Sequence, residues 1–159
     1  MIINGLPLHP LVVHAAVVFV PLMLVFAILL FIPKIQRSMT YAAGITGVVA
    51  FLFVALANQS GEALQQQVAS TQAILTHVQL AQGVPLIVFV AGGILTVLAI
   101  LEFPKPLALV HFRARLGFLR WVIPLGRILG LVMATVSVYL VYNLGESGAL
   151  AVWGSRFPL

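Results

Sequence analysis

The chain opens on Gly5-Leu6-Pro7-Leu8-His9-Pro10-Leu11-Val12-Val13-His14, and its apolar run then continues from Ala15 to Phe31 without an ionisable group. The segment from about residue 12 to residue 31 has roughly the twenty residues that a helix needs to cross a hydrocarbon core of about 30 Å. It therefore predicts a membrane-spanning helix, kinked at Pro21. In that helix His14 would lie about one turn inside the apolar phase and His9 at its edge.

The composition excludes an ordinary soluble domain. Of 159 residues, 62% are hydrophobic and only 7% are charged, against roughly 25% charged in soluble proteins. The net charge of +5 comes from loop residues with no basic helix face, which excludes a nucleic-acid-binding surface. The absence of cysteine excludes disulfides, thiolate metal sites and covalently attached haem. We predict an integral protein of the lipid bilayer whose chemistry rests on histidines and carboxylates.

Three further apolar stretches predict spans at about 41–57, 84–103 and 122–142. The fold class expected is therefore all-α, a single four-helix transmembrane domain over residues 1–159. Between the second and third spans, apolar residues recur at helical spacing in an otherwise polar segment, at Leu64, Val68, Leu75 and Val78. We expect a short amphipathic segment there, at the membrane surface or at the bundle mouth.

The basic residues predict the orientation of the bundle. Seven of the eight lie on one side of the predicted spans, namely Lys34, Arg37, Lys105, Arg113, Arg115, Arg120 and Arg127, whereas Arg156 lies on the other. By the positive-inside rule both basic loops face the cytoplasm and both termini face outward. No cleaved signal peptide is expected, because residues 1–10 lack a basic segment.

The two halves of the chain look alike. His14 precedes Pro21-Leu22 by seven residues, and His77 precedes Pro85-Leu86 by eight. The second span ends in Asn58-Gln59-Ser60-Gly61-Glu62, and the fourth ends in Asn143-Leu144-Gly145-Glu146-Ser147-Gly148. This pattern predicts two helix-hairpin repeats related by an axis along the membrane normal. It pairs His14 with His77, at equal depth on opposite sides of the bundle.

That placement favours one kind of ligand. Neighbouring helices pack about 8–10 Å apart, so diagonal helices stand roughly 12–14 Å apart, which leaves room for a planar macrocycle between two imidazoles. We therefore expect His14 and His77 to be the axial ligands of a haem-like cofactor, b-type haem, near the outer face. Such a protein would carry electrons as a membrane redox protein or as a subunit of a respiratory or photosynthetic assembly.

Other interpretations stay open. His9, His14 and His77, supported by Glu62, form an alternative copper or zinc site. Each intramembrane histidine also has a purely structural interpretation, a hydrogen bond to a backbone carbonyl of a neighbouring helix. His9 fits a helix start in the headgroup layer, and Glu62 fits either a helix cap or an acceptor that orients an imidazole. A cofactor-free accessory subunit, with protein partners in a membrane complex or a homo-oligomer, is the third hypothesis.

Three further ionisable residues have simpler interpretations. Glu146 allows the same two roles as Glu62. His111 lies among the arginines of the second basic loop, where we expect solvent or anionic lipid around it. Glu102 ends the third span, where Lys105 or Arg127 can neutralise it.

The segment Gly5 to His14, the tripeptide Ser60-Gly61-Glu62 and His77 together resemble the bacterial membrane family catalogued as domain of unknown function 2231. The resemblance covers nearly the whole chain. It implies a small four-helix membrane protein, some of whose relatives are fused to or encoded beside cytochrome-like or iron–sulfur redox modules, and it implies no activity. Its motif covers His9, His14, Glu62 and His77, whereas the proline that often follows the second histidine closely is delayed here to Pro21.

Overall fold

The computed structural model describes residues 2–3, 6–102, 117 and 119–154. The elements are β1 (Ile2–Ile3), β2 (Leu6–Pro7), α1 (Leu8–Leu29), α2 (Gln36–Gln65), α3 (Gln72–Ala81), α4 (Val84–Glu102) and α6 (Leu119–Trp153). The two short strands pair antiparallel ahead of α1. Within the described residues, four helical stretches are long and apolar enough to cross a membrane, with α3 and α4 counted as one. The predicted all-α membrane fold is confirmed.

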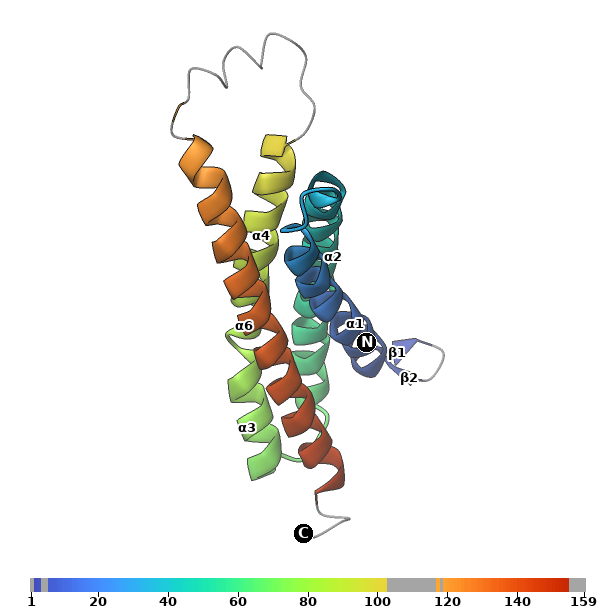
Figure 1. Ribbon diagram of the computed structural model, residues 1–159. Helices are drawn as coiled ribbons and strands as arrows, with labels where there is room; N and C mark the ends of the chain where they lie inside the picture. Colours follow the sequence, from blue (N-terminus) through green and yellow to red (C-terminus); the bar gives the residue numbers. More distant parts are fainter. Residues whose placement is uncertain (1, 4–5, 103–116, 118, 155–159) are drawn as a thin grey trace.

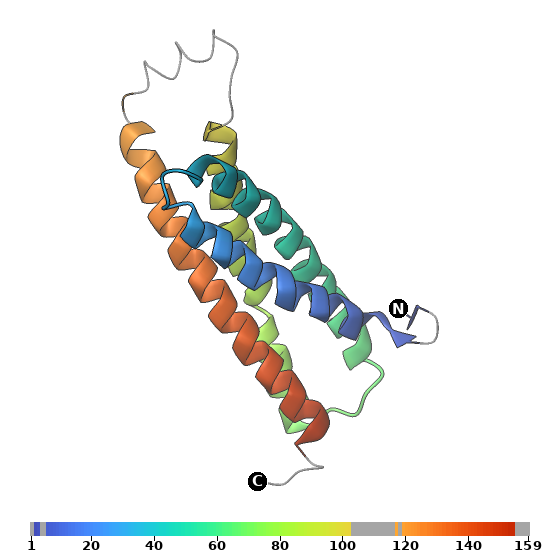
Figure 2. The ribbon, with the colours of Figure 1, turned by 45° about the vertical axis from the view of Figure 1, so that its right-hand side comes forward.

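The helices form a ring in which each long helix touches two others. Helix α1 packs against α2, α2 against α4, α4 against α6, and α6 against α1. Helix α1 therefore stands diagonally across from α4, and α2 across from α6 (Figures 1 and 2). The sequence alone did not predict which helices are diagonal, because short loops allow more than one arrangement of the four helices around the bundle.

Helices α2 and α6, with 30 and 35 residues, are longer than the spans predicted for them from hydropathy. Helix α2 has 30 residues and runs on through the polar tail to Gln65, which makes it about 45 Å long at 1.5 Å per residue. The polar segment after it is consequently shorter than expected. It contains the ten-residue helix α3, whose first turn is capped by the Thr71 side chain accepting from the backbone N–H of Ile74.

The predicted amphipathic segment is therefore divided between two helices. Residue Leu64 belongs to the end of α2, whereas Leu75 and Val78 belong to α3. Helix α3 packs against the end of α6 and continues in the general direction of α4 (Figure 1). Of the two locations expected for this segment, its contacts with α6 place it at the bundle mouth.

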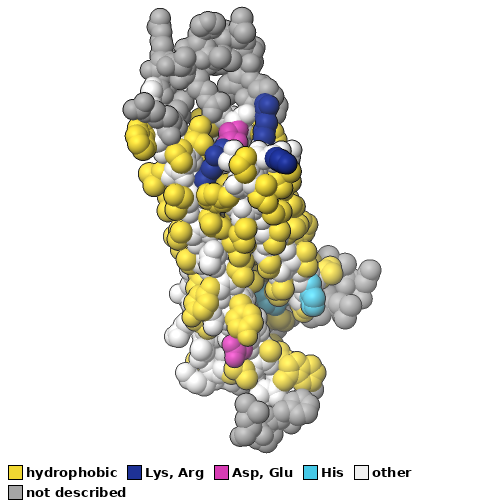
Figure 3. Space-filling model, in the orientation of Figure 1, with side chains coloured by type: hydrophobic (Ala, Val, Ile, Leu, Met, Phe, Trp, Pro, Cys, Tyr) yellow, Lys and Arg dark blue, Asp and Glu magenta, His cyan; other side chains and the backbone are white. Residues whose placement is uncertain are grey.

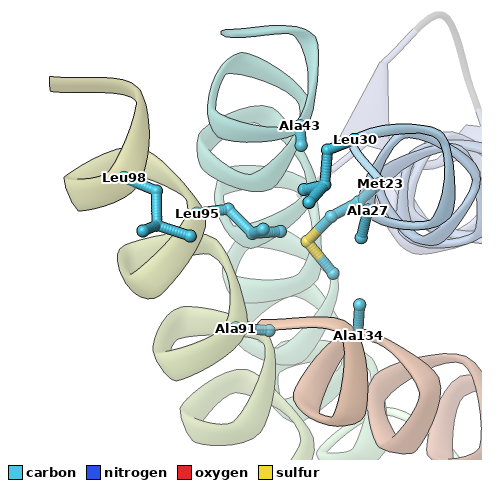
Figure 4. Close-up of a cluster of buried hydrophobic side chains, with 8 residues drawn as sticks. All are labelled: Met23, Ala27, Leu30, Ala43, Ala91, Leu95, Leu98 and Ala134. Atoms are coloured by element: carbon cyan, nitrogen blue, oxygen red, sulfur yellow. The ribbon is translucent and has the colours of Figure 1, made fainter. Parts of the chain in front are cut away.

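Two apolar clusters fill the space between the helices. One lies in the half of the bundle shown in Figure 4 and consists of Met23, Ala27, Leu30, Ala43, Ala91, Leu95, Leu98 and Ala134. The other continues toward the opposite end and consists of Ala16, Val20, Ala50, Val54, Val84, Val88 and Val141. Most of these side chains are small, so the helices approach closely.

The closest approach joins α2 to α4. A Cβ atom added to Gly47 would lie 2.6 Å from the Cα atom of Gly92, and one added to Gly92 would lie 2.7 Å from the Gly47 carbonyl oxygen. No side chain fits between these backbones, whereas a Cβ atom on the adjacent Gly93 would meet nothing within 4 Å. The contact therefore depends on the residue type at positions 47 and 92.

An ion pair closes the end of the bundle where the basic residues gather (Figure 3). Arg127 of α6 pairs with Glu102 of α4, and both side chains are largely buried, at 18% and 11% exposed. The Tyr41 hydroxyl of α2 donates to the Glu102 backbone oxygen and accepts from Arg37 Nε. We call this the basic end. The prediction that Arg127 can neutralise Glu102 is confirmed. Outside the described residues lie Lys105, His111, Arg113, Arg115 and Arg156.

Glu102→Gln is predicted to destabilise the protein, because it leaves the Arg127 guanidinium buried without a counter-charge. A loss of about 3 kcal/mol is expected for a broken buried pair. Thermal unfolding of the purified protein in detergent measures it, with the exposed Glu146→Gln as control. Equal melting temperatures for the two variants would show that the ion pair does not hold α4 to α6.

Gly92→Ala and Gly93→Ala form a matched pair of substitutions at neighbouring positions. Gly92→Ala is predicted to lower the melting temperature, because overpacking costs about 1–3 kcal/mol. Gly93→Ala is predicted to leave it unchanged or to raise it, since alanine is the better helix former by about 1 kcal/mol. The same response from both variants would contradict the close contact between α2 and α4.

Candidate functional site

His9 crosses from α1 to the end of α2. Its Nδ1 atom lies 2.9 Å from the Ala57 carbonyl oxygen and 3.3 Å from Ser60 Oγ. Ser60 is buried, and its hydroxyl donates to the same carbonyl over 3.1 Å. A carbonyl oxygen only accepts hydrogen bonds, so Nδ1 of His9 carries the hydrogen. In the neutral ring Nε2 then has a free electron pair.

His77 crosses from α3 to the end of α6 in the same way. Its Nδ1 atom lies 2.9 Å from Ser147 Oγ. The Ser147 hydroxyl donates to the Leu144 carbonyl oxygen over 2.9 Å. With the serine hydrogen directed to that oxygen, Nδ1 of His77 donates to Ser147 and Nε2 keeps its electron pair, whereas the opposite tautomer requires the hydroxyl to turn its hydrogen to Nδ1.

Each imidazole also lies against a glycine. A Cβ atom on Gly61 would be 3.0 Å from Cε1 of His9, and one on Gly148 would be 3.1 Å from Cε1 of His77. A side chain at either position would push the ring out of place. The two histidines therefore share a serine, a carbonyl oxygen three residues before it, and the glycine after it.

Corresponding residues of the two halves are separated by a constant number of positions along the chain. His77 lies 68 positions after His9. That shift also carries the buried residues at 16, 20, 23, 27 and 30, in α1 and directly after it, onto buried residues of α4 at 84, 88, 91, 95 and 98. A shift of 87 carries Ser60 onto Ser147, and the buried residues of α2 at 43, 47, 50 and 54 onto those of α6 at 130, 134, 137 and 141. His9, rather than His14, is thus the counterpart of His77.

His14 lies elsewhere. It is exposed, and its Nδ1 atom is 2.6 Å from the Pro10 carbonyl oxygen of its own helix. By the shift that relates α1 to α4, its counterpart is Gln82. The contacts give no support to the predicted pairing of His14 with His77, because the α1 ring that reaches a second helix is that of His9.

The two anchored imidazoles lie at one end of the bundle, one on α1 and the other just ahead of α4, the helix diagonal to α1. His9 is on α1, and His77 is on α3, directly ahead of α4. They are close enough for the charge of one to act on the other. We call this the histidine end, defined by His9, Ser60, His77 and Ser147. Figure 3 shows histidine side chains toward the end opposite Lys and Arg.

The acidic residues do not join the imidazoles. Glu62 is exposed, and its Oε1 atom accepts from Asn58 Nδ2 of the same helix over 2.8 Å. It does not cap a helix start, because α2 continues to Gln65. Among the described residues no three His, Cys, Asp or Glu side chains are placed to hold one metal ion. The copper or zinc site of His9, His14, His77 and Glu62 is therefore not assembled in that part of the chain.

Comparison with known proteins gives one match. The model of the family described as predicted membrane protein, domain of unknown function 2231 (DUF2231), matches residues 5–157. The chain belongs to this family. No curated protein and no solved structure gives a significant match. The DUF2231 assignment agrees with the four apolar helices and names no activity, so the function is argued from the histidine end.

Sequence reasoning on this DUF2231 chain missed the residues that hold the rings. The dipeptide Ser-Gly stands at the end of both second helices of the hairpins, as Ser60-Gly61 and Ser147-Gly148. The sequence analysis gave a role to the nearby glutamates instead. By the shift of 87, however, Glu62 corresponds to Ala149 and Glu146 to Gln59, so the two glutamates are not counterparts. The shared Ser-Gly was the available signal.

His9→Ala and His77→Ala are each predicted to lower stability by about 1 kcal/mol, because each removes a hydrogen bond between two helices. His14→Ala is the control, since its ring bonds only to its own helix and is expected to leave stability unchanged. The melting temperatures of the three cofactor-free variants, measured by thermal unfolding, test these expectations. A larger loss for His14→Ala would contradict the assignment of His9 as the anchored ring.

Proposed function

We propose that this protein is a membrane electron-transfer subunit that binds a haem-like cofactor between His9 and His77. The observation that carries the proposal is the matched anchoring of two imidazoles, one on α1 and the other just ahead of the diagonal helix α4, at one end of an apolar bundle. Metal-binding histidines nearly always donate their other ring N–H to a carbonyl or a similar acceptor. Both rings here do so through Nδ1.

The distance between diagonal helices supports a planar ligand. At about 12–14 Å, as neighbour spacings of about 8–10 Å imply, two imidazoles on opposite helices reach both faces of a macrocycle but do not reach one bare ion with bonds of about 2 Å. Because the chain has no cysteine, a haem would be held without covalent attachment, as a b-type group. When bound, it would supply one-electron exchange.

The residues of the chain would ligate and bury that group. Ala16, Val20, Val84 and Val88 of the neighbouring apolar cluster would keep water away and so contribute to the reduction potential. The positive-inside rule supports a bacterial inner membrane with the basic end in the cytoplasm and the histidine end outside. The subunit would then exchange electrons between a membrane carrier and an outer partner, as part of a larger assembly or a homo-oligomer.

A visible absorption spectrum of the purified protein tests the proposal. The expected result is a Soret band of a low-spin, bis-histidine haem, present on isolation or after loading with haemin. His9→Ala and His77→Ala are each predicted to abolish the low-spin spectrum, and His14→Ala to retain it. No Soret band in the loaded wild type would overturn the proposal and would leave a cofactor-free accessory subunit. A spectrum lost only in His14→Ala would overturn the choice of ligands.

A further inference from the structure

The hydrogen bonds at the histidine end bear on which ring nitrogen of His9 and of His77 carries the hydrogen. Each serine hydroxyl has one hydrogen, and the geometry directs it to a backbone oxygen, Ala57 for Ser60 and Leu144 for Ser147. Each serine oxygen can therefore only accept from the imidazole beside it. Nδ1 of His9 thus faces two acceptors, the Ala57 carbonyl oxygen and Ser60 Oγ, and Nδ1 of His77 faces one, Ser147 Oγ.

A neutral imidazole has a single ring N–H. If acceptors hold it on Nδ1, Nε2 presents an electron pair and no hydrogen. A ligand at Nε2 of the neutral ring must therefore accept that electron pair, as a metal centre or as a hydrogen-bond donor. A metal centre does so, whereas a quinone carbonyl or a carboxylate offers only further electron pairs.

We propose that Ser60 and Ser147 are positioning residues that fix His9 and His77 as Nδ1–H tautomers, so that the paired site takes a Lewis-acidic, metal-centred ligand and rejects hydrogen-bond acceptors. This inference rests on the proposed function for the identity of the ligand. Gly61 and Gly148 complete each half of the site, because they let the ring lie flat against the helix.

The two halves differ in one respect. Nδ1 of His9 keeps the Ala57 carbonyl oxygen at 2.9 Å when Ser60 is removed, because Ser60 is its longer contact at 3.3 Å. His77 has Ser147 Oγ as its contact at 2.9 Å. Ser147 therefore orients its ring more strongly than Ser60 does, and the two alanine variants are predicted to differ.

Nitrogen NMR of the cofactor-free protein, labelled with ¹⁵N-histidine, tests the tautomers without any cofactor. The wild type is expected to show His9 and His77 as Nδ1–H tautomers. Ser147→Ala is expected to give His77 a mixture of tautomers, and Ser60→Ala a smaller change at His9. Ser137→Ala is the matched control, because this buried serine also donates to its own helix, at Met133, and touches neither imidazole. An Nε2–H tautomer in the wild type would overturn the proposal, as would equal effects of Ser147→Ala and Ser137→Ala.

Two probes then test the ligand class. Haemin is expected to perturb the Nε2 signals of both rings, and decylubiquinone to leave them unchanged. Ser147→Ala is expected to bind haemin at least about tenfold more weakly and to shift its midpoint potential, as the loss of a group that orients a metal ligand does, whereas Ser137→Ala changes neither. Perturbation by the quinone would overturn the ligand class. If haemin fails to bind the wild type, the proposed function fails, and the tautomers still decide whether the serines position the rings.

Discussion

Backbone oxygens are the main acceptors that this bundle offers to its buried hydroxyls, and the structure depends on that constraint. A helix in lipid must satisfy its polar groups internally, because no water reaches them. The buried hydroxyls accordingly donate to their own helix, as Thr40 does to Gln36, Thr46 to Ala42 and Ser137 to Met133. These bonds leave the helices apolar outside and free to pack through small residues.

His9 and His77 use the same acceptors across helix boundaries. Each ring joins the serine and carbonyl of another helix, so the turn that satisfies the serine also holds the imidazole. This arrangement ties α1 to α2 and α3 to α6 within each hairpin. It also fixes which ring nitrogen is available, and thus connects the packing of the bundle to the chemistry that its end can perform.

The two ends of the bundle differ in symmetry. At the histidine end both halves carry a histidine, a serine and a glycine at corresponding positions. At the basic end the correspondence fails, because Arg127 takes the place of Thr40, and Glu102 that of Lys34. A single ion pair in the second half, joined to α2 through Tyr41, therefore closes that end. The two hairpins thus each hold a histidine against a serine at one end and are joined by an asymmetric polar contact at the other.

The sequence by itself determined the membrane class and the four helices, because length, hydropathy and the absence of charge act locally along the chain. Only the tertiary structure decided which helices are diagonal, where α2 ends and which histidine of α1 bonds to a second helix. His9 and His14 are five residues apart, which is roughly 140° around a helix of 3.6 residues per turn. Both rings suit the apolar edge equally well in sequence, but that rotation turns one toward Ser60 and the other out of the bundle.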